Sequence, residues 1–297
     1  MCKKCGKKAI IEYPYPMCNQ HFKDYYLQTV QKTIEKYKMF NKEDRILVAV
    51  SGGKDSSALV YALYELGYEF EGLYINLEIP NYSEYSEKAV KELFKLINYK
   101  INIIRVSDYN VKVKQIHRRP ICSVCGIIKR YLMNRFAYEN GFTVIATAHN
   151  LIDEAAFFLM NMNSGQIQYL IKQEPVLPKE NKFVKKVKPL YFLTERENMI
   201  YSIINKLPVY HGSCPNASGN PQAKWKHILY KIENENPGFI RNFVNFMLKL
   251  KRYIYYPEKK EEIFYCKYCG YPTGSKGKIC AFCKIQQYFN NNKKLEL

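Results

Sequence analysis

Long apolar runs are missing from this sequence of 297 residues. None approaches the ~20 residues that span a bilayer, and the polar, cysteine-bearing N-terminus is unlike a signal peptide. The patterns G-x-G-x-x-G and G-x-x-x-x-G-K-[S/T] are missing too, which excludes the dinucleotide fingerprint and the Walker-type loop. We therefore expect a soluble, cytoplasmic protein with no membrane partner, and any nucleotide site must be of another kind.

Acidic residues are scarce. The chain has 27 Asp and Glu against 46 Lys and Arg, a formal net charge of +19. Such an excess favours a polyanionic partner, although a coding bias towards lysine would produce the same count. Hydrophobic residues make up 47% of the chain, which excludes global disorder and allows a sizeable core.

Apolar and helix-like segments alternate along the first half of the chain. This alternation predicts an α/β fold, a parallel sheet with helices on both faces in a Rossmann-like arrangement. Such sheets bind ligands at the carboxyl ends of their strands, here residues 51–56, 76–80 and 148–153. The expected strands are 45–50, 70–77, 101–106 and 142–148, and the expected helices are 25–41, 55–66, 83–97, 126–139 and 153–163.

Three parts are expected along the chain. Residues 1–24 and 256–297 are short, cysteine-containing and flank a larger unit at 25–255, which reads as mostly helical after about 195. The two short parts predict zinc ribbons, and the central part predicts the nucleotide-binding domain.

The ten cysteines fall into three groups. In a cytosolic chain, paired cysteines indicate metal rather than disulfides, and the C-x2-C spacing is typical of tetrahedral zinc. We expect one zinc ion at each end, where it would replace a core that such short segments cannot form. The ribbon surfaces would then face RNA. The expected zinc ligands are Cys2, Cys5, Cys18 and His21 at one end and Cys266, Cys269, Cys280 and Cys283 at the other.

The middle group has only three cysteines, Cys122, Cys125 and Cys214. A structural zinc ion would need a fourth ligand, for which His211 is a candidate. An iron–sulfur cluster on three cysteines would leave one iron open to a substrate or a sulfur atom. A persulfide or disulfide relay without metal is the third alternative. Spacing alone does not separate these three.

The stretch "AVSGGKDSSALV" places two glycines and a lysine between a strand and a helix. Gly52 and Gly53 let the backbone approach a ligand closely, and amides at the start of a helix can bind phosphate. Lys54 adds a positive charge, and Ser51 and Ser56 add hydroxyl donors. A plain glycine turn would not require Lys-Asp-Ser in that order.

This stretch resembles the pyrophosphate loop of ATP pyrophosphatases that adenylate a carbonyl oxygen. "CSVCGIIKRYLMNRFAYENGF", "TAHNLIDEA", "VKKVKPLYFLTERE" and "LYINLEIPNYSE" resemble the TtuA family of tRNA 2-thiouridine synthetases over nearly the whole chain. The resemblance implies that ATP activates the C2 oxygen of a tRNA uridine, which sulfur then displaces. It also implies a [4Fe-4S] cluster on the three middle cysteines. The sulfur would come from a thiocarboxylated ubiquitin-like carrier or from sulfide, and the protein would be a homodimer.

Carried over residue by residue, the resemblance implies catalytic roles for Lys129 and Asp153. Lys129 lies one helical turn after Cys125, where it would neutralise charge on a phosphate or adenylate; the alternative is an ordinary surface lysine. Asp153 would bind Mg²⁺ or orient the uridine; the alternative is a helix-start carboxylate. The implied contacts to ATP are Ala49, Val50, Ser51, Gly52, Gly53, Lys54, Asp55, Ser56, Ile75 and Ala148.

Other polar residues beside these motifs have two interpretations. Arg118 and Arg119 suit phosphate contacts or form a solvated charge pair. His149 and Asn150 are site residues or turn residues, and we favour the turn for Asn150.

The sequence departs from the family pattern at four positions. "YINLEIP" and "TAHNLIDEA" stand where the family has "YIDLGIP" and "TGHNLDDEA", so two carboxylates are lost, at 76 and 152, and Glu78 adds one nearby, a net loss of one. The departures at Asn76, Glu78, Ala148 and Ile152 lie near the expected site for ATP and uridine. We expect a sulfurtransferase acting on uridine 54 of the T-loop. The alternatives are the wobble uridine 34 and a non-catalytic RNA-binding paralogue.

Overall fold

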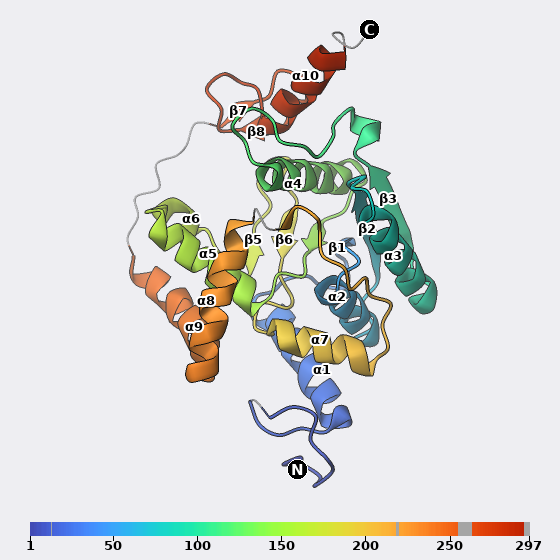
Figure 1. Ribbon diagram of the computed structural model, residues 1–297, viewed down its shortest axis with the longest axis vertical. Helices are drawn as coiled ribbons and strands as arrows, with labels where there is room; N and C mark the ends of the chain where they lie inside the picture. The colour runs from blue at the N-terminus through green and yellow to red at the C-terminus, as the bar shows by residue number, and fades with distance from the viewer. Residues whose placement is uncertain (13, 218–219, 255–262, 294–297) are drawn as a thin grey trace.

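A six-stranded sheet forms the centre of the computed structural model, which describes residues 1–12, 14–217, 220–254 and 263–293 (Figure 1). The strand order is β3-β2-β1-β4-β6-β5, and every neighbouring pair is parallel except β5 with β6. The strands are β1 (Ile46–Val50), β2 (Phe70–Asn76), β3 (Ile101–Arg105), β4 (Val144–Ala146), β5 (Val176–Leu177) and β6 (Lys185–Val187).

Helices cover both faces of this sheet, as the sequence predicts. They are α1 (Asn19–Lys36), α2 (Lys54–Glu65), α3 (Ser83–Ile97), α4 (Ile121–Glu139), α5 (Leu151–Asn163), α6 (Ile167–Ile171), α7 (Glu195–Ile204), α8 (Pro221–Glu235), α9 (Phe239–Leu250) and α10 (Ala281–Lys293). Short 3₁₀ turns lie at Ser107–Tyr109 and Lys251–Tyr253. Among the described residues, no helix has the length and apolarity to cross a membrane.

The alternation of side chains along each strand creates two separate cores. Ile46, Val48 and Val50 of β1 pack towards α1, α2, α3 and α7, whereas Leu47 faces α4 together with Ile145 of β4. Successive residues of a strand point to opposite faces, so one strand contributes to both cores. A third core joins α5 to α8 and α9.

The ends of the chain pack on this framework. Met17 and Phe22 belong to the core under α1. At the other end, β7 (Phe264–Tyr265), β8 (Pro272–Thr273) and α10 lie over α4 (Figure 1), where Phe282 stacks on Tyr131 with ring centroids 3.9 Å apart. The predicted boundary at 255/256 lies outside the described residues.

Three expectations for the elements were inaccurate. The helix expected at 126–139 begins five residues earlier, directly after Pro120, so Cys122 and Cys125 are both helical. The helix expected at 25–41 runs from Asn19 to Lys36 and therefore carries His21. The strands β5 and β6 were not expected; they are two and three residues long, too short for a two-residue period to be recognised.

Candidate active site

The phosphate-loop candidate connects the carboxyl end of β1 to the start of α2. Gly52 has φ of +78°, and a Cβ atom there would lie 2.6 Å from the carbonyl oxygen of Ser86, so only glycine fits. The Ser56 hydroxyl donates to the Gly53 carbonyl oxygen at 2.9 Å, and it accepts from the Ser51 amide at 3.1 Å. These contacts fix the loop before any ligand binds.

Amides at the start of α2 suit an anion. Within the described parts of the chain, the amides of Gly53, Lys54 and Asp55 have no hydrogen-bond acceptor. The first amides of a helix point out of it and carry the positive end of its dipole. The loop therefore fits the phosphates of a nucleotide.

Charged groups around the loop form a network that joins three helices. The Lys54 ammonium lies 3.0 Å from Asp55 Oδ2 and 2.6 Å from Glu195 Oε1 at the start of α7. The other oxygen of Asp55 accepts from the Asn150 side-chain amide at 3.1 Å and from the Asn198 amide at 2.8 Å. Asn150 thus caps α5 and also holds Asp55, so it is more than a turn residue.

Asp153 lies at the first turn of α5, after the end of β4, and both of its carboxylate oxygens are engaged. Lys226 of α8 lies 2.6 Å from Oδ1, and the Gln222 amide donates to the same oxygen at 3.2 Å. Oδ2 accepts from the Asn150 backbone amide at 3.1 Å in a capping box. Asp153 therefore has the helix-start role that the sequence suggested, and it also forms an ion pair with Lys226.

Glu195 connects the two halves of this network. Burial opposes its ionisation, but Lys226, Lys54 and the Tyr230 hydroxyl outweigh that cost and lower its pKa to about 2. The Tyr230 hydroxyl donates to Glu195 Oε2 at 2.6 Å. Glu195 is consequently a permanent anion at neutral pH, and it raises the pKa of Lys54 in return, together with Asp55 and against the effect of burial.

The middle cysteines lie at the same edge of the sheet. Cys122 and Cys125 occupy the first turns of α4, and Cys214 lies in the segment between α7 and α8. The Cys122 thiol donates to the Asn216 carbonyl oxygen at 3.2 Å, which joins α4 to that segment. Burial raises the pKa of the Cys125 thiol against the opposing effect of Lys129. All three cysteines are partly exposed.

The spacing of these thiols distinguishes them from the terminal groups. Within the described residues, only the two terminal groups have all their ligand atoms within 4.8 Å of one another; the middle cysteines and His211 form no such set. A single zinc ion requires closely gathered ligands. The cysteines of a cluster bind different iron atoms, so they can be further apart. The donor set therefore fits a cluster better than one zinc ion.

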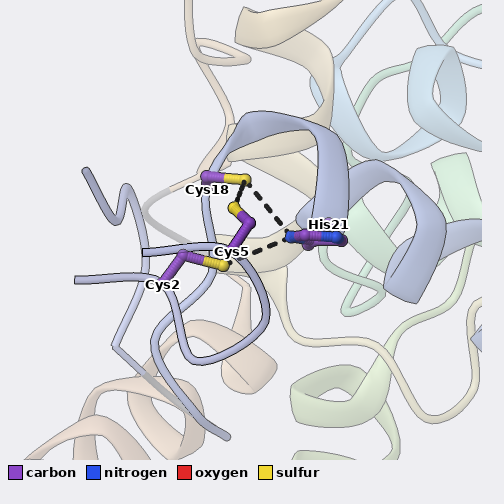
Figure 2. Close-up of side chains that lie close together, drawn as sticks. All are labelled: Cys2, Cys5, Cys18 and His21. Carbon is purple, nitrogen blue, oxygen red and sulfur yellow. Dashed lines mark hydrogen bonds between the residues drawn. The ribbon is translucent and has the colours of Figure 1, made fainter. Parts of the chain in front are cut away.

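The N-terminal group has the geometry of a zinc site. Figure 2 shows Cys2, Cys5, Cys18 and His21 converging from the N-terminal loop and the start of α1. A tetrahedral zinc ion with Zn–S of ~2.3 Å separates its ligand atoms by about 3.5–3.8 Å. Here Cys5 Sγ and Cys18 Sγ are 3.6 Å apart, and Cys18 Sγ and His21 Nδ1 are 3.5 Å apart. His21 presents Nδ1 to the group.

The C-terminal group has the same spacing. Its four sulfur atoms lie within 4.8 Å of one another, and Cys269 Sγ and Cys280 Sγ are 3.7 Å apart. This set lies against α4, the helix that carries Cys122 and Cys125. A metal there would hold the segment that packs on the cysteine helix.

Three of the residues that depart from the family pattern, Asn76, Glu78 and Ile152, make identifiable contacts within the fold. Ile152 is 2% exposed and belongs to the core that joins α5 to α8 and α9. The Glu78 carboxylate accepts from the Ser107 amide at 3.0 Å and from its hydroxyl at 2.7 Å. Asn76 is buried and donates to Glu87 at 2.5 Å. The Glu78 carboxylate is thus already engaged by Ser107, in the turn after β3.

The other predicted site residues lie around this edge. Ala49 and Val50 end β1. Ile75 packs between the two clusters on the α4 side of the sheet, and Ala148 packs against the core that β1 forms with α1 and α2. Arg118 and Arg119 are exposed in the loop before α4. Sequence reasoning missed Glu195, Lys226, Tyr230 and Asn198 because nothing local identifies them. Only the capping box of Thr194 and Glu197 signals where α7 begins.

Known proteins resemble this chain along most of its length. The PP-loop domain family matches residues 24–207. A tRNA-5-methyluridine(54) 2-sulfurtransferase of Pyrococcus horikoshii is 48% identical over 292 residues, 96% of this chain and 93% of its own. The Thermotoga maritima protein of that name is 38% identical over 98% of both chains. The solved structure of the U34-tRNA thiolase NcsA from Methanococcus maripaludis, with its [4Fe-4S] cluster, has a TM-score of 0.83 and 25% identity; the match covers 97% of this chain and 95% of that one.

Proposed function

The chain belongs to the TtuA family of tRNA 2-thiouridine synthetases, which are PP-loop ATP pyrophosphatases, and on this premise we propose that it thiolates uridine 54 of tRNA. ATP adenylates the C2 oxygen of the uridine, and sulfur then displaces AMP. The first step forms an O–P bond and releases pyrophosphate; the second forms a C–S bond and breaks the C–O bond.

One contact supports this proposal most strongly. The Tyr210 amide donates to the Gly52 carbonyl oxygen at 2.8 Å, which attaches the segment carrying Cys214 to the phosphate loop. Activation and sulfur delivery must act on the same carbon atom, so their residues must lie together. This hydrogen bond holds the two sets of residues at one edge of the sheet.

The residues of the loop bind the nucleotide. We assign the triphosphate to the amides at the start of α2, with Lys54 and the Ser51 and Ser56 hydroxyls as further donors. Asp55 and Glu195 hold Lys54 in place beforehand, so less side-chain entropy is lost on binding. Asp153 contributes a carboxylate for Mg²⁺ or for the uridine, and Lys226 fixes its orientation.

The sulfur side depends on α4. Cys122, Cys125 and Cys214 would hold a [4Fe-4S] cluster, which when bound supplies an iron position for the incoming sulfur atom. Lys129 lies one helical turn beyond Cys125, where its charge offsets the negative charge that gathers during displacement.

Further parts of the proposal follow from family membership. We assign zinc to both terminal groups and retain the division into parts 1–24, 25–255 and 256–297. The sulfur donor would be a thiocarboxylated ubiquitin-like carrier or sulfide, and the enzyme would be a cytoplasmic homodimer.

The test uses protein purified without oxygen, ATP, Mg²⁺, sulfide and unmodified tRNA. Nuclease mapping with mass spectrometry should find the 2-thio nucleoside at position 54 with wild type and Ser213→Ala, and none with Cys214→Ala. Sulfur found only in the anticodon loop would reassign the protein to the wobble uridine. RNA binding without any sulfur transfer would favour the non-catalytic alternative.

A further inference from the structure

Two cations where α4 packs on the sheet have no carboxylate partner among the described residues. No ion pair joins Arg130 of α4 or Lys186 of β6 to an acidic group anywhere in the described chain. The two charges are close enough that Arg130 lowers the pKa of Lys186, after the larger effect of burial. Unpaired cations repel one another in a partly dry site, so an anion is needed to make the pair favourable.

Arg130 is directed towards the cysteines. A Cβ atom at Gly126 would lie 3.1 Å from Nη1 of Arg130, so the guanidinium folds back over the glycine one turn earlier. Long side chains on a helix lean towards its N-terminus. Arg130 is exposed, and because Gly126 follows Cys125 directly, the guanidinium lies over the helical turn that carries this thiol. A larger residue at 126 would displace the guanidinium from this position.

The Lys186 side chain extends from β6 towards α4, the helix that carries Arg130. Its neighbours on β6 face the other side: Val187 joins the core under α2, and the Lys185 ammonium donates to the Lys38 carbonyl oxygen at 2.8 Å. Lys186 therefore faces α4, as does Ile145, its partner on β4. Burial lowers the pKa of His149, in the loop before α5, and the charges of Lys188 and Lys186 add to that effect.

This pair is separate from the nucleotide loop. β6 lies two strands from β1, about 10 Å at the usual strand spacing, and Lys186 faces the opposite side of the sheet from α2. The loop has its own amides and its own lysine for the nucleotide phosphates. A second anion is therefore the natural occupant of the Arg130–Lys186 pair.

We propose that Arg130 and Lys186 form a subsite for a backbone phosphate of the RNA strand that carries the target uridine. The proposal rests on the function assigned above and names how that site holds its substrate. A uridine extruded from a folded RNA brings its flanking phosphates with it. A phosphate held beside the cysteine-bearing turn of α4 would fix the reach and orientation of the base. Arginine suits this role because its planar fork binds two phosphate oxygens.

The experiment compares Arg130→Gln and Lys186→Gln with controls on the same two elements. Arg135→Gln changes an arginine of α4 that pairs with Glu139 at 2.8 Å, and Lys185→Gln changes the neighbouring lysine of β6 that faces the other side. Affinity for unmodified tRNA is measured at several salt concentrations. Iron content, ATP affinity and the extent of thiolation are recorded for every variant.

Each subsite variant should lower the slope of log affinity against log salt by about 0.7–0.9, the value for one phosphate contact. At 0.1 M salt the same relation gives a loss of affinity of about five- to eightfold. Arg130→Lys should restore the slope but not the full rate of thiolation, since it keeps the charge and loses the fork. The two controls should leave slope, affinity and rate unchanged.

A neutral methylphosphonate linkage next to the target uridine supplies a second measurement. Wild type should lose about five- to eightfold in affinity for such a T-arm RNA, whereas Arg130→Gln should lose nothing further. Loss of affinity by both proteins at every position would overturn the inference.

Other outcomes also decide the question. Variants that lose iron with an unchanged salt slope would show that the cations serve the cluster, and weaker ATP binding with an unchanged slope would assign them to the nucleotide. Either result overturns the inference and leaves the proposed function intact. If wild type binds tRNA but transfers no sulfur, the proposed function fails, while the salt slopes still decide the phosphate subsite.

Discussion

Replacing Lys186 by methionine should make the protein more stable. Burial, followed by Arg130 and Lys188, lowers the pKa of this lysine from 10.5 to about 8, so folding has to accommodate an unfavourable charge at neutral pH. The shift corresponds to about 3 kcal/mol, which solvent at the partly open site reduces to about 2 kcal/mol. Methionine keeps the apolar stem of the side chain and removes the charge. For a chain of this size, about 2 kcal/mol raises the melting temperature by about 4 °C.

The pH dependence gives this prediction a second signature. The folded pKa of Lys186 is below its unfolded value, so the unfolded state binds more protons between pH 8 and 10.5. The charge is therefore destabilising below pH 8, and the cost disappears as pH rises towards 10.5. Thermal melts of cluster-free protein should show the largest advantage of Lys186→Met below pH 8 and none near pH 10.5. A variant that melts below wild type, or a matching gain in Lys185→Met, would refute the reasoning.

Three further predictions concern the remaining groups. Glu195→Gln should lower the free energy of unfolding of the nucleotide-free protein by about 3 kcal/mol at pH 7, because the pKa of Glu195 is lowered to about 2. The difference in stability between wild type and variant should vanish as pH falls from about 4.5 to 2. Urea titrations at several pH values measure this difference. Cys214→Ala should lose iron and thiolation but keep ATP affinity, measured by calorimetry against Ser213→Ala; iron retained at the wild-type level contradicts it. Cys280→Ala should halve the zinc content from two ions per chain to one by elemental analysis, and a content still at two would contradict the C-terminal assignment.

Local patterns explain why much of the fold was predictable. β1 and β2 are apolar, end at turn residues, and are followed by helices, so the sequence alone predicts their parallel pairing. Both terminal metal groups were predictable because each contains ligand pairs separated by two residues. A single tight turn of backbone brings both members of such a pair to the same ion. The start of α4 was missed, since no capping side chain precedes Ile121 and Pro120 supplies the boundary instead.

The candidate site was only partly predictable, because its residues come from distant parts of the chain. Lys54 and Glu195 are 141 residues apart, and no local pattern requires their contact of 2.6 Å. Glu78 shows the opposite difficulty: its position in the sequence suggests a site carboxylate, yet its side chain closes the turn at Ser107. Proximity in sequence therefore led to the loop and the cysteines as candidates, but it gave no sign of residues such as Glu195 that hold Lys54 in place.

Charge is distributed unequally between the two sides of this site. On the nucleotide side, both lysines of the network have an anion: Lys54 meets Asp55 and Glu195, and Lys226 meets Asp153. On the sulfur side, Arg130 and Lys186 form no ion pair with a carboxylate among the described residues. Paired charges are preorganised, whereas an unpaired charge in a partly dry site is more costly until an anion arrives. Nucleotide can therefore bind to a prepared loop, while the sulfur side reaches its favourable state only with substrate in place. That asymmetry would couple completion of the site to the arrival of RNA, so ATP should react slowly when no tRNA is present.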